Sequence, residues 1–280
     1  MILEAIEWLL TPSSLLARRS GLLAGQIAIR HRALRCRGFW HSHLQSTRQA
    51  IRSYLQQFDK PLNRVMVLGS GHLHDCDLHD LLDHAQRVVL VDIVHPVELY
   101  WHLFRRKDTF TLLTRDLSFS LSSALRGQTH PERPDEAFLS LLHSCDAVIS
   151  LNLLSQLPLG AHDIWQAHGR TDQEIETLCG DIIRRHIELL QQCPDALLIT
   201  DRVVRVRGIE KEQPQIGAWQ DLLYGQELPP AHNEWIWTIA SPQERGDAFW
   251  EERNVVCIPV GQSIEKGSKT SSRFSGNDQS

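Results

Sequence analysis

Residues 65–75 read VMVLGSGHLHD, and this stretch decides the fold class of the 280-residue chain. Four consecutive apolar residues, from Val65 to Leu68, predict a strand that is buried on both faces, because a half-exposed strand would alternate apolar and polar side chains. Gly69 ends the strand, and the G-S-G turn lets the backbone bend tightly and approach a ligand closely. The free N–H groups of a following helix would face that ligand. The stretch therefore predicts the first strand and the ligand-binding turn of an α/β domain.

The same alternation of short apolar runs and amphipathic stretches continues as far as residue 260. Further strands are predicted at 88–91, 110–113, 147–151, 196–199, 235–239 and 255–260. Helices are predicted at 78–85, 97–104, 135–142 and 172–192, and a loop at 118–134. Thr171 and Glu174 form a capping box that opens the last of these helices. Alternating strands and helices predict a Rossmann-like, mostly parallel sheet of about seven strands with flanking helices, whose last two strands pair antiparallel.

The first part of the chain reads as a helical extension. Apolar residues at helical spacing predict helices at 2–10, 15–37 and 46–58. Residues 1–60 carry a net charge of +6, whereas the whole chain carries −5. Such a segment either meets an anionic partner or rests as a basic cap on its own acidic domain, and we favour the cap. The predicted divisions are an N-terminal helical cap (1–61), a Rossmann-like cofactor-binding domain (62–261) and a Ser, Gly, Lys and Asn-rich tail expected to be disordered (262–280).

Composition narrows the class of protein. The hydrophobic fraction of 42% and the charged fraction of 22% are those of an ordinary globular protein. No apolar run approaches the roughly 20 residues that span a bilayer. Glu4 and Glu7 precede every Lys and Arg, which is the opposite of a secretory signal, so we expect a cytoplasmic protein. The six cysteines form no C-x-x-C pair, and we expect them to be reduced and partly buried.

Polar residues follow the predicted strands where each strand ends. Asp92 follows the second strand, 23 residues after Gly69, Asp116 follows the third, and Asn152 follows the fourth. Ligands of open α/β sheets bind outside the carboxyl ends of the strands. An acid about 20 residues beyond the glycine turn is the expected partner of ribose hydroxyls, and Asp116 can accept from an exocyclic amine such as that of adenine. This order and spacing predict a site for an adenosyl cofactor.

At these residues the chain resembles the class I S-adenosylmethionine-dependent methyltransferases. The likeness is carried by VMVLGSGHLHD (65–75), VVLVD (88–92), TRDL (114–117), CDAVISLNLLSQLP (145–158) and LLITD (197–201). It covers about residues 62–260, and it implies S-adenosylmethionine as cofactor and methyl transfer as the reaction. The residues it implies for cofactor binding are the glycine turn Gly69-Ser70-Gly71 at the methionine part, Asp92 at the ribose, Asp116 at the adenine, and Leu151 and Asn152 at the sulfonium and the substrate. Ile93 and Leu117, which follow the two acids, are also expected to bind the cofactor. The methyl acceptor stays unidentified; we expect it to be small or anionic.

The chain departs from the family's pattern at two positions. Val67 stands where the family usually has an acid, two residues before the first glycine, and Leu73 stands near the usual third glycine. Asp75 or Asp77 is the candidate to replace the missing carboxylate at the positively charged methionine end. If neither does, a degenerate methyltransferase fold that acts as a binding module is the alternative.

Methyl transfer needs alignment of the acceptor and a desolvated pocket more than covalent help. A general base is needed only if the acceptor must lose a proton. The candidates for this role are His41, His43, Asn152 and Gln156. Trp235 and Trp237 share one face of a predicted strand, where they pack in the core or line the substrate pocket. The sequence assigns no catalytic residue.

Two further enzyme classes stay open. The glycine turn and Asp92 would also serve an NAD(P)-dependent oxidoreductase, although His74 stands where the third glycine of that motif belongs. The cluster HLHDCD at 72–77 has the residue types of a metal hydrolase. Cys76 and Asp77 break the H-x-H-x-D-H pattern, so no metal site is predicted.

The basic N-terminal segment supports one more hypothesis. In this hypothesis the segment closes over the cofactor pocket and presents Arg30, Arg32 or Arg35 to an anionic substrate. Nucleic acid stays open as a partner, but only Phe39 and Trp40 lie nearby to stack on bases.

Overall fold

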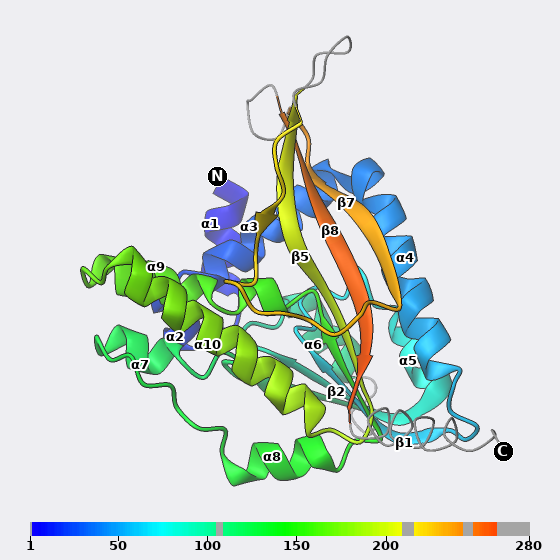
Figure 1. The fold of residues 1–280 in the computed structure, drawn as a ribbon. Helices are drawn as coiled ribbons and strands as arrows, with labels where there is room; N and C mark the ends of the chain where they lie inside the picture. Colours follow the sequence, from blue (N-terminus) through cyan, green and yellow to red (C-terminus); the bar gives the residue numbers. More distant parts are fainter. Residues whose placement is uncertain (1, 105–108, 209–215, 243–248, 262–280) are drawn as a thin grey trace, which may run out of the picture.

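The computed structural model describes residues 2–104, 109–208, 216–242 and 249–261. The tail at 262–280, for which disorder was predicted, lies outside the described residues. Figure 1 shows a central twisted sheet with helices on both of its faces, three of the N-terminal helices (α1, α2 and α3) near one another and the fourth (α4) alongside β7. Among the described helices, none is both long enough and apolar enough to cross a membrane.

The sheet contains eight strands within the described residues, in the order β3-β2-β1-β4-β5-β8-β7, with β6 paired to β5. The strands are β1 (Leu62–Leu68), β2 (Ala85–Asp92), β3 (Phe110–Thr114), β4 (Ala147–Leu151), β5 (Ala196–Gly208), β6 (Gln220–Asp221), β7 (Asn233–Ala240) and β8 (Phe249–Val260). The first five strands of this order are parallel, and β8 pairs antiparallel with both β5 and β7. The predicted mostly parallel sheet and its antiparallel final pair are confirmed.

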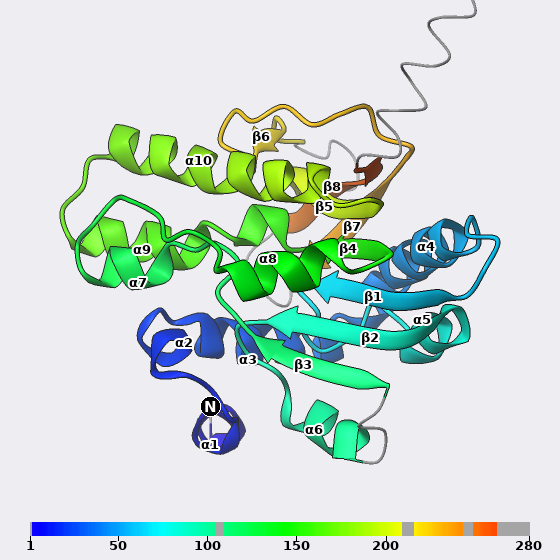
Figure 2. The ribbon, with the colours of Figure 1, turned by 90° about the horizontal axis from the view of Figure 1, so that it is seen from below.

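Helices cover both faces of the sheet (Figure 2). They are α1 (Ile2–Leu10), α2 (Leu15–Arg19), α3 (Leu22–Arg35), α4 (Arg37–Leu55), α5 (Leu78–His84), α6 (Val97–Phe104), α7 (Leu121–Leu125), α8 (Glu136–His143), α9 (Leu159–Ala167), α10 (Asp172–Gln191) and the short 3₁₀ helix η1 (Leu154–Gln156). Side chains alternate across a strand, so neighbouring residues of β1 join different cores. Met66 packs with the α8, α9 and α10 side. Val67 packs with the α4 and α5 side.

Several predicted elements differ from the structure, three of them in the first half of the chain. The helix predicted at 15–37 is two helices, because Gly21 adopts a left-handed φ of 76° between them. Residues 118–134 are not all loop: α7 forms within them and buries Leu121 and Ala124. The helix predicted at 46–58 begins earlier, at Arg37. By contrast, the predicted capping box that opens α10 is confirmed.

The N-terminal helices reach the carboxyl ends of the central strands. Ser13, between α1 and α2, forms an isolated bridge with Val94, which follows β2. Trp40 of α4 donates its indole N–H to the carbonyl of Ile239 in β7 at 3.0 Å. All six cysteines are buried. Helices α1 to α3 and the first part of α4 thus lie at the end of the sheet where ligands bind in such folds, while the rest of α4 packs along one face.

Candidate active site

A cavity of about 330 Å³ opens at the carboxyl ends of β1, β2 and β4, and α3 and α4 cover it. We call it the strand-end cavity. Its walls include every residue that the sequence predicted for cofactor binding: Gly69, Ser70, Gly71, Asp92, Ile93, Asp116, Leu117, Leu151 and Asn152. The covering helices contribute Gln26, Arg32, Trp40 and His43, among others. These residues from six separate segments therefore surround one space.

The turn after β1 requires glycine for two different reasons. Gly69 has a φ of +79°, and a Cβ there would lie 2.8 Å from the Cβ of Leu153 and 3.0 Å from the carbonyl oxygen of Leu151. The end of β4 thus packs directly on the turn. Gly71 has a φ of +45°, but a Cβ there would meet nothing closer than 4.0 Å. Its outer side is open, so a ligand can approach the backbone closely.

Asp92 is held by the backbone around it. Its Oδ2 accepts from the N–H of Gly71 at 2.8 Å, and its Oδ1 accepts from the N–H of Ile93 at 2.7 Å. Gln26 of α3 donates to the same Oδ1 at 3.5 Å, so the covering helix touches this acid. Asp92 is buried, and the loss of solvation raises its pKa, while the bond from Gly71 acts in the opposite direction.

The Asp116 carboxylate folds its own loop. Its oxygens accept from the N–H and the hydroxyl of Ser118 at 2.9 and 2.6 Å. They also accept from the N–H groups of Ser120 and Leu121 at 3.2 and 3.0 Å. Four donors shape the turn into α7 and place Leu117 in the cavity wall. Asp116, for which the sequence predicted a contact with adenine, thus also stabilises the loop after β3.

Asn152 links the end of β4 to the segment after the glycine turn. It has a left-handed φ of 47°, and its Nδ2 donates to Oδ2 of Asp75 at 2.5 Å. Its Oδ1 is buried, and the described residues offer it no donor. Burial raises the pKa of Asp75, and the bond from Asn152 opposes this. Asp77, the other candidate for the missing carboxylate, caps α5 by accepting from the N–H of His79 and does not line the cavity.

His43 lies buried at the far end of the cavity, against two tryptophans of β7. Its ring stacks on Trp237 with 4.1 Å between centroids and 9° between planes. The indole N–H of Trp235 donates to its Nδ1 at 3.0 Å, and its Nε2 lies 3.4 Å from Nδ2 of Asn152. Burial lowers the pKa of His43 to about 3. Trp237 packs in the core, as the sequence favoured, and it also lines the cavity, while Trp235 packs against the same core.

Of the other two candidates for a general base, one lies on the surface and one lines the cavity. His41 is exposed, whereas Gln156 lines the cavity and donates to the carbonyl of Asn152 at 2.8 Å. Sequence reasoning missed Arg253 of β8, which also lines the cavity. Its guanidinium pairs with the buried carboxylate of Asp201 and, at 3.1 Å, with that of Glu251. Arg253 sits in an otherwise unremarkable strand, so no local signal marked it.

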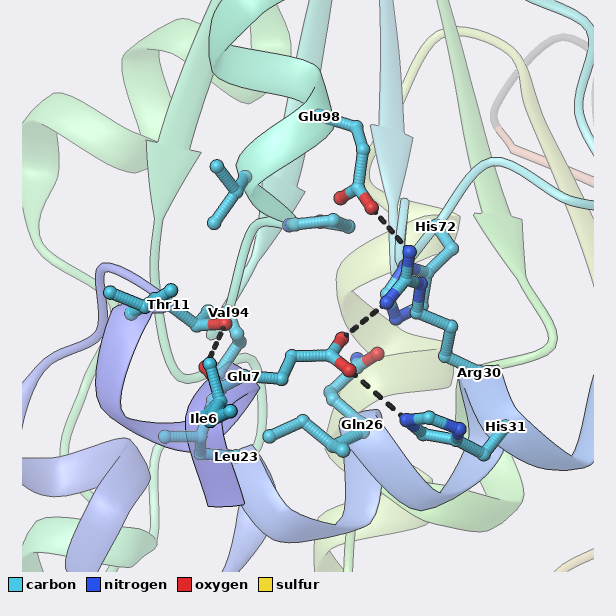
Figure 3. Close-up of a pocket in the computed structure, with 14 residues that line it drawn as sticks. Ile6, Glu7, Thr11, Leu23, Gln26, Arg30, His31, His72, Val94 and Glu98 are labelled. Atoms are coloured by element: carbon cyan, nitrogen blue, oxygen red, sulfur yellow. Dashed lines mark hydrogen bonds and ion pairs between the residues drawn. The ribbon is translucent and has the colours of Figure 1, made fainter. Parts of the chain in front are cut away.

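A second cavity of about 350 Å³ lies between α1, α3 and the start of α6, and it shares Gln26 and His72 with the first. Figure 3 shows Arg30 between two carboxylates, with Glu7 at 2.9 Å and Glu98 at 2.6 Å. His31 also contacts Glu7, at 3.1 Å.

The arginines named by the anionic-substrate hypothesis therefore differ in position. Arg30 is engaged by two carboxylates, Arg35 is exposed on the surface, and Arg32 lines the strand-end cavity.

The histidines after the glycine turn pack on each other. The rings of His72 and His74 stack with centroids 5.4 Å apart, and burial lowers the pKa of His72 to about 4. Within the described residues, no group of three or more His, Cys, Asp or Glu side chains is placed to hold a metal ion. The metal-hydrolase alternative gains no support from this geometry.

No protein-family model matches the chain, and no curated protein matches its sequence. Several solved structures are similar to it, among them these three. The Burkholderia thailandensis 1,6-didemethyltoxoflavin-N1-methyltransferase, with bound 1,6-didemethyltoxoflavin and S-adenosylhomocysteine, is 13% identical over 88% of this chain and 91% of its own, with a TM-score of 0.41. A DhpI–SAM–HEP complex is 14% identical over 94% and 91%, with a TM-score of 0.32. Human N-acetylserotonin methyltransferase in complex with SAM is 12% identical over 75% and 51%, with a TM-score of 0.28.

The fold assignment rests on the order and direction of the strands. Five parallel strands run in the order β3-β2-β1-β4-β5, and the antiparallel pair β8 and β7 closes the sheet. The chain therefore has a Rossmann-like α/β fold, whose parallel strands follow the doubly wound order and whose last two strands are antiparallel.

Proposed function

We propose that this protein is an S-adenosylmethionine-dependent methyltransferase that acts on a small molecule. One observation carries the proposal: a single cavity at the strand ends gathers the glycine turn, the acid after β2, the loop after β3 and the asparagine after β4. Ligands of open α/β sheets bind at this position. The cofactor would supply a methyl group on a sulfonium, and the residues of the chain would bind and align it.

The polar groups of the cavity fit such a cofactor. Asp92 would receive the ribose hydroxyls, in place of the long 3.5 Å contact from Gln26. The open side of Gly71 leaves room for the methionine part, and Asp75 would receive its amino group. Asp116 and Leu117 would border the adenine. The buried Oδ1 of Asn152, for which the described residues provide no donor, is the kind of acceptor that a bound ligand satisfies.

A small acceptor suits the enclosure of the cavity. Helices α3 and α4 cover it, and Trp40, Trp237 and Ile239 line one part of it with apolar surface. Such walls exclude water and hold an acceptor in line with the methyl group, which is what this chemistry requires. Of the three arginines that the sequence named for an anionic substrate, Arg32 lines this cavity, where it would meet an anionic group on the acceptor.

Calorimetry tests the proposal. S-adenosylmethionine, S-adenosylhomocysteine, NAD and NADP are titrated into wild type, Asp92→Ala and the exposed control Asp83→Asn. We expect micromolar binding of the adenosyl pair to wild type and the control, with loss in Asp92→Ala. Binding of NAD or NADP instead would make the protein an oxidoreductase. Absence of binding to all four would favour the degenerate binding module.

A further inference from the structure

The ring of His43 is held in one protonation pattern by Trp235. The indole N–H of Trp235 lies 3.0 Å from Nδ1 of His43. An indole nitrogen only donates hydrogen bonds, so Nδ1 must accept and therefore carries no proton. A neutral imidazole has one N–H, which then resides on Nε2. Burial keeps the ring neutral, since it lowers the pKa of His43 to about 3.

The Nε2–H of this tautomer lacks a protein acceptor. Its nearest polar neighbour is Nδ2 of Asn152 at 3.4 Å, and that atom is itself a donor, which is spent on Asp75 at 2.5 Å. Turning the Asn152 amide over would offer Oδ1 to His43, but it would remove the hydrogen bond that Nδ2 donates to Asp75. This bond favours the amide as it stands.

The surroundings of His43 are rich in donors. Trp237, on which His43 stacks, has a buried indole N–H for which the described residues supply no acceptor. A buried donor without a partner is costly, so groups of this kind in a cavity wall indicate a ligand that accepts hydrogen bonds.

We propose that Trp235 holds His43 as the Nε2-protonated tautomer, and that His43 donates a hydrogen bond to a carbonyl oxygen or an unprotonated ring nitrogen of the methyl acceptor. The second half rests on the proposed methyltransferase function. The atom that accepts this bond orients the acceptor, and a different atom takes the methyl group. His43 is then a specificity-determining donor and not the general base considered from the sequence.

Nitrogen NMR tests the tautomer without a cofactor or an acceptor. In ¹⁵N-histidine-labelled protein at neutral pH, long-range ¹H–¹⁵N correlations distinguish the two neutral tautomers, and His43→Gln assigns the signal. We expect the Nε2–H pattern in wild type and a mixed pattern in Trp235→Phe. The control Trp219→Phe, whose indole lies over Arg205 at 4.3 Å, should leave the pattern unchanged. An Nδ1–H pattern or a charged ring in wild type overturns the proposal.

Turnover tests the acceptor. Wild type, His43→Gln and His43→Leu are assayed with S-adenosylmethionine and a panel that pairs each neutral nitrogen heterocycle or ketone with an amine of matched size. We expect turnover of the heterocycles or ketones. We also expect a KM for them that rises about tenfold in His43→Leu, partly restored in His43→Gln, whose amide N–H can replace Nε2–H.

The affinity for S-adenosylhomocysteine should stay unchanged in both variants. Turnover of the amines alone, or an unchanged KM in His43→Leu, overturns the acceptor half of the proposal. Failure of wild type to bind S-adenosylhomocysteine would defeat the methyltransferase function itself, while the NMR pattern would still decide the tautomer.

Discussion

Gly71 donates its backbone N–H to Oδ2 of Asp92 at 2.8 Å, although the two residues lie 21 positions apart. The bond joins the glycine turn after β1 to the acid after β2. A glycine at 71 leaves the outer side of the turn open, while its N–H holds the carboxylate in place. The backbone that would approach the cofactor and the carboxylate that would bind its ribose are therefore positioned as one unit.

Replacement of Gly69 by alanine should lower the free energy of unfolding by more than backbone strain alone explains. Gly69→Ala adds a Cβ 2.8 Å from the Cβ of Leu153 at a φ of +79°. Gly169→Ala is the matched control, since its φ is +75° and no atom lies within 4 Å of the added Cβ. We expect the control to lose about 1–2 kcal/mol of unfolding free energy through strain. Gly69→Ala should lose at least about 1 kcal/mol more through overpacking, measured by urea unfolding. Equal losses would show that the contact with Leu153 relaxes freely.

Two neighbouring aspartates should respond differently to loss of charge. Asp75→Asn should weaken binding of S-adenosylmethionine and S-adenosylhomocysteine equally, by about tenfold, because both carry the amino group that Asp75 would receive. Asp77→Asn should leave both affinities unchanged, since Asp77 caps α5 outside the cavity and asparagine also caps helices. Calorimetry on the two variants measures this. The reverse pattern would assign the missing carboxylate to Asp77.

Buried His186 of α10 should make the free energy of unfolding decrease in mild acid. Nε2 of His186 lies 2.9 Å from the hydroxyl of Ser150, and burial lowers the pKa of His186 from 6.5 to about 4. Between these values the unfolded chain binds more protons than the folded one, so the unfolding free energy decreases as pH falls. The loss is on the order of 3 kcal/mol and is complete once the pH passes below the folded pKa.

Urea unfolding of wild type and His186→Gln at pH 7 and pH 4.5 measures this contribution. The variant should show a smaller loss between the two pH values than wild type. The exposed control His79→Gln should match wild type. An identical loss in His186→Gln and wild type would mean that other groups carry the pH dependence.

The contacts of Glu7 with Arg30 and His31 should hold α1 on the rest of the molecule. Glu7 contacts both Arg30 and His31, whereas the more exposed Glu98 contacts Arg30 from α6. Glu7→Gln should cost about 0.5–1 kcal/mol and speed hydrogen exchange in α1. Glu98→Gln removes a pair that does not involve α1, so it should leave exchange there nearly unchanged. Equal exchange in the two variants would mean that α1 is held by its apolar face alone.

Local patterns in the sequence predicted most of the strands. They failed where a segment forms a strand or helix only because of its contacts with distant parts of the chain. The outer half of β5 alternates arginine with apolar residues, and Arg205 pairs with Glu252 of β8 at 2.8 Å only once the strands have met. This half of β5 is therefore not an apolar run, and the strand predicted at 196–199 was shorter than the observed strand, which ends at Gly208. The five residues of α7 are too few to show helical periodicity, so they were read as loop.

The sequence by itself determined the fold class and the order of the strand-end residues, because apolar runs, glycine turns and the acids that follow strands are local signals. Only the tertiary structure decided which candidates face the cavity. Asp75 and Asp77 stand two positions apart, yet one lines the cavity and the other caps a helix. His43 and Trp235 are joined across 192 positions by the docking of α4 on β7. Such a contact depends on how distant elements pack, which no spacing along the chain records.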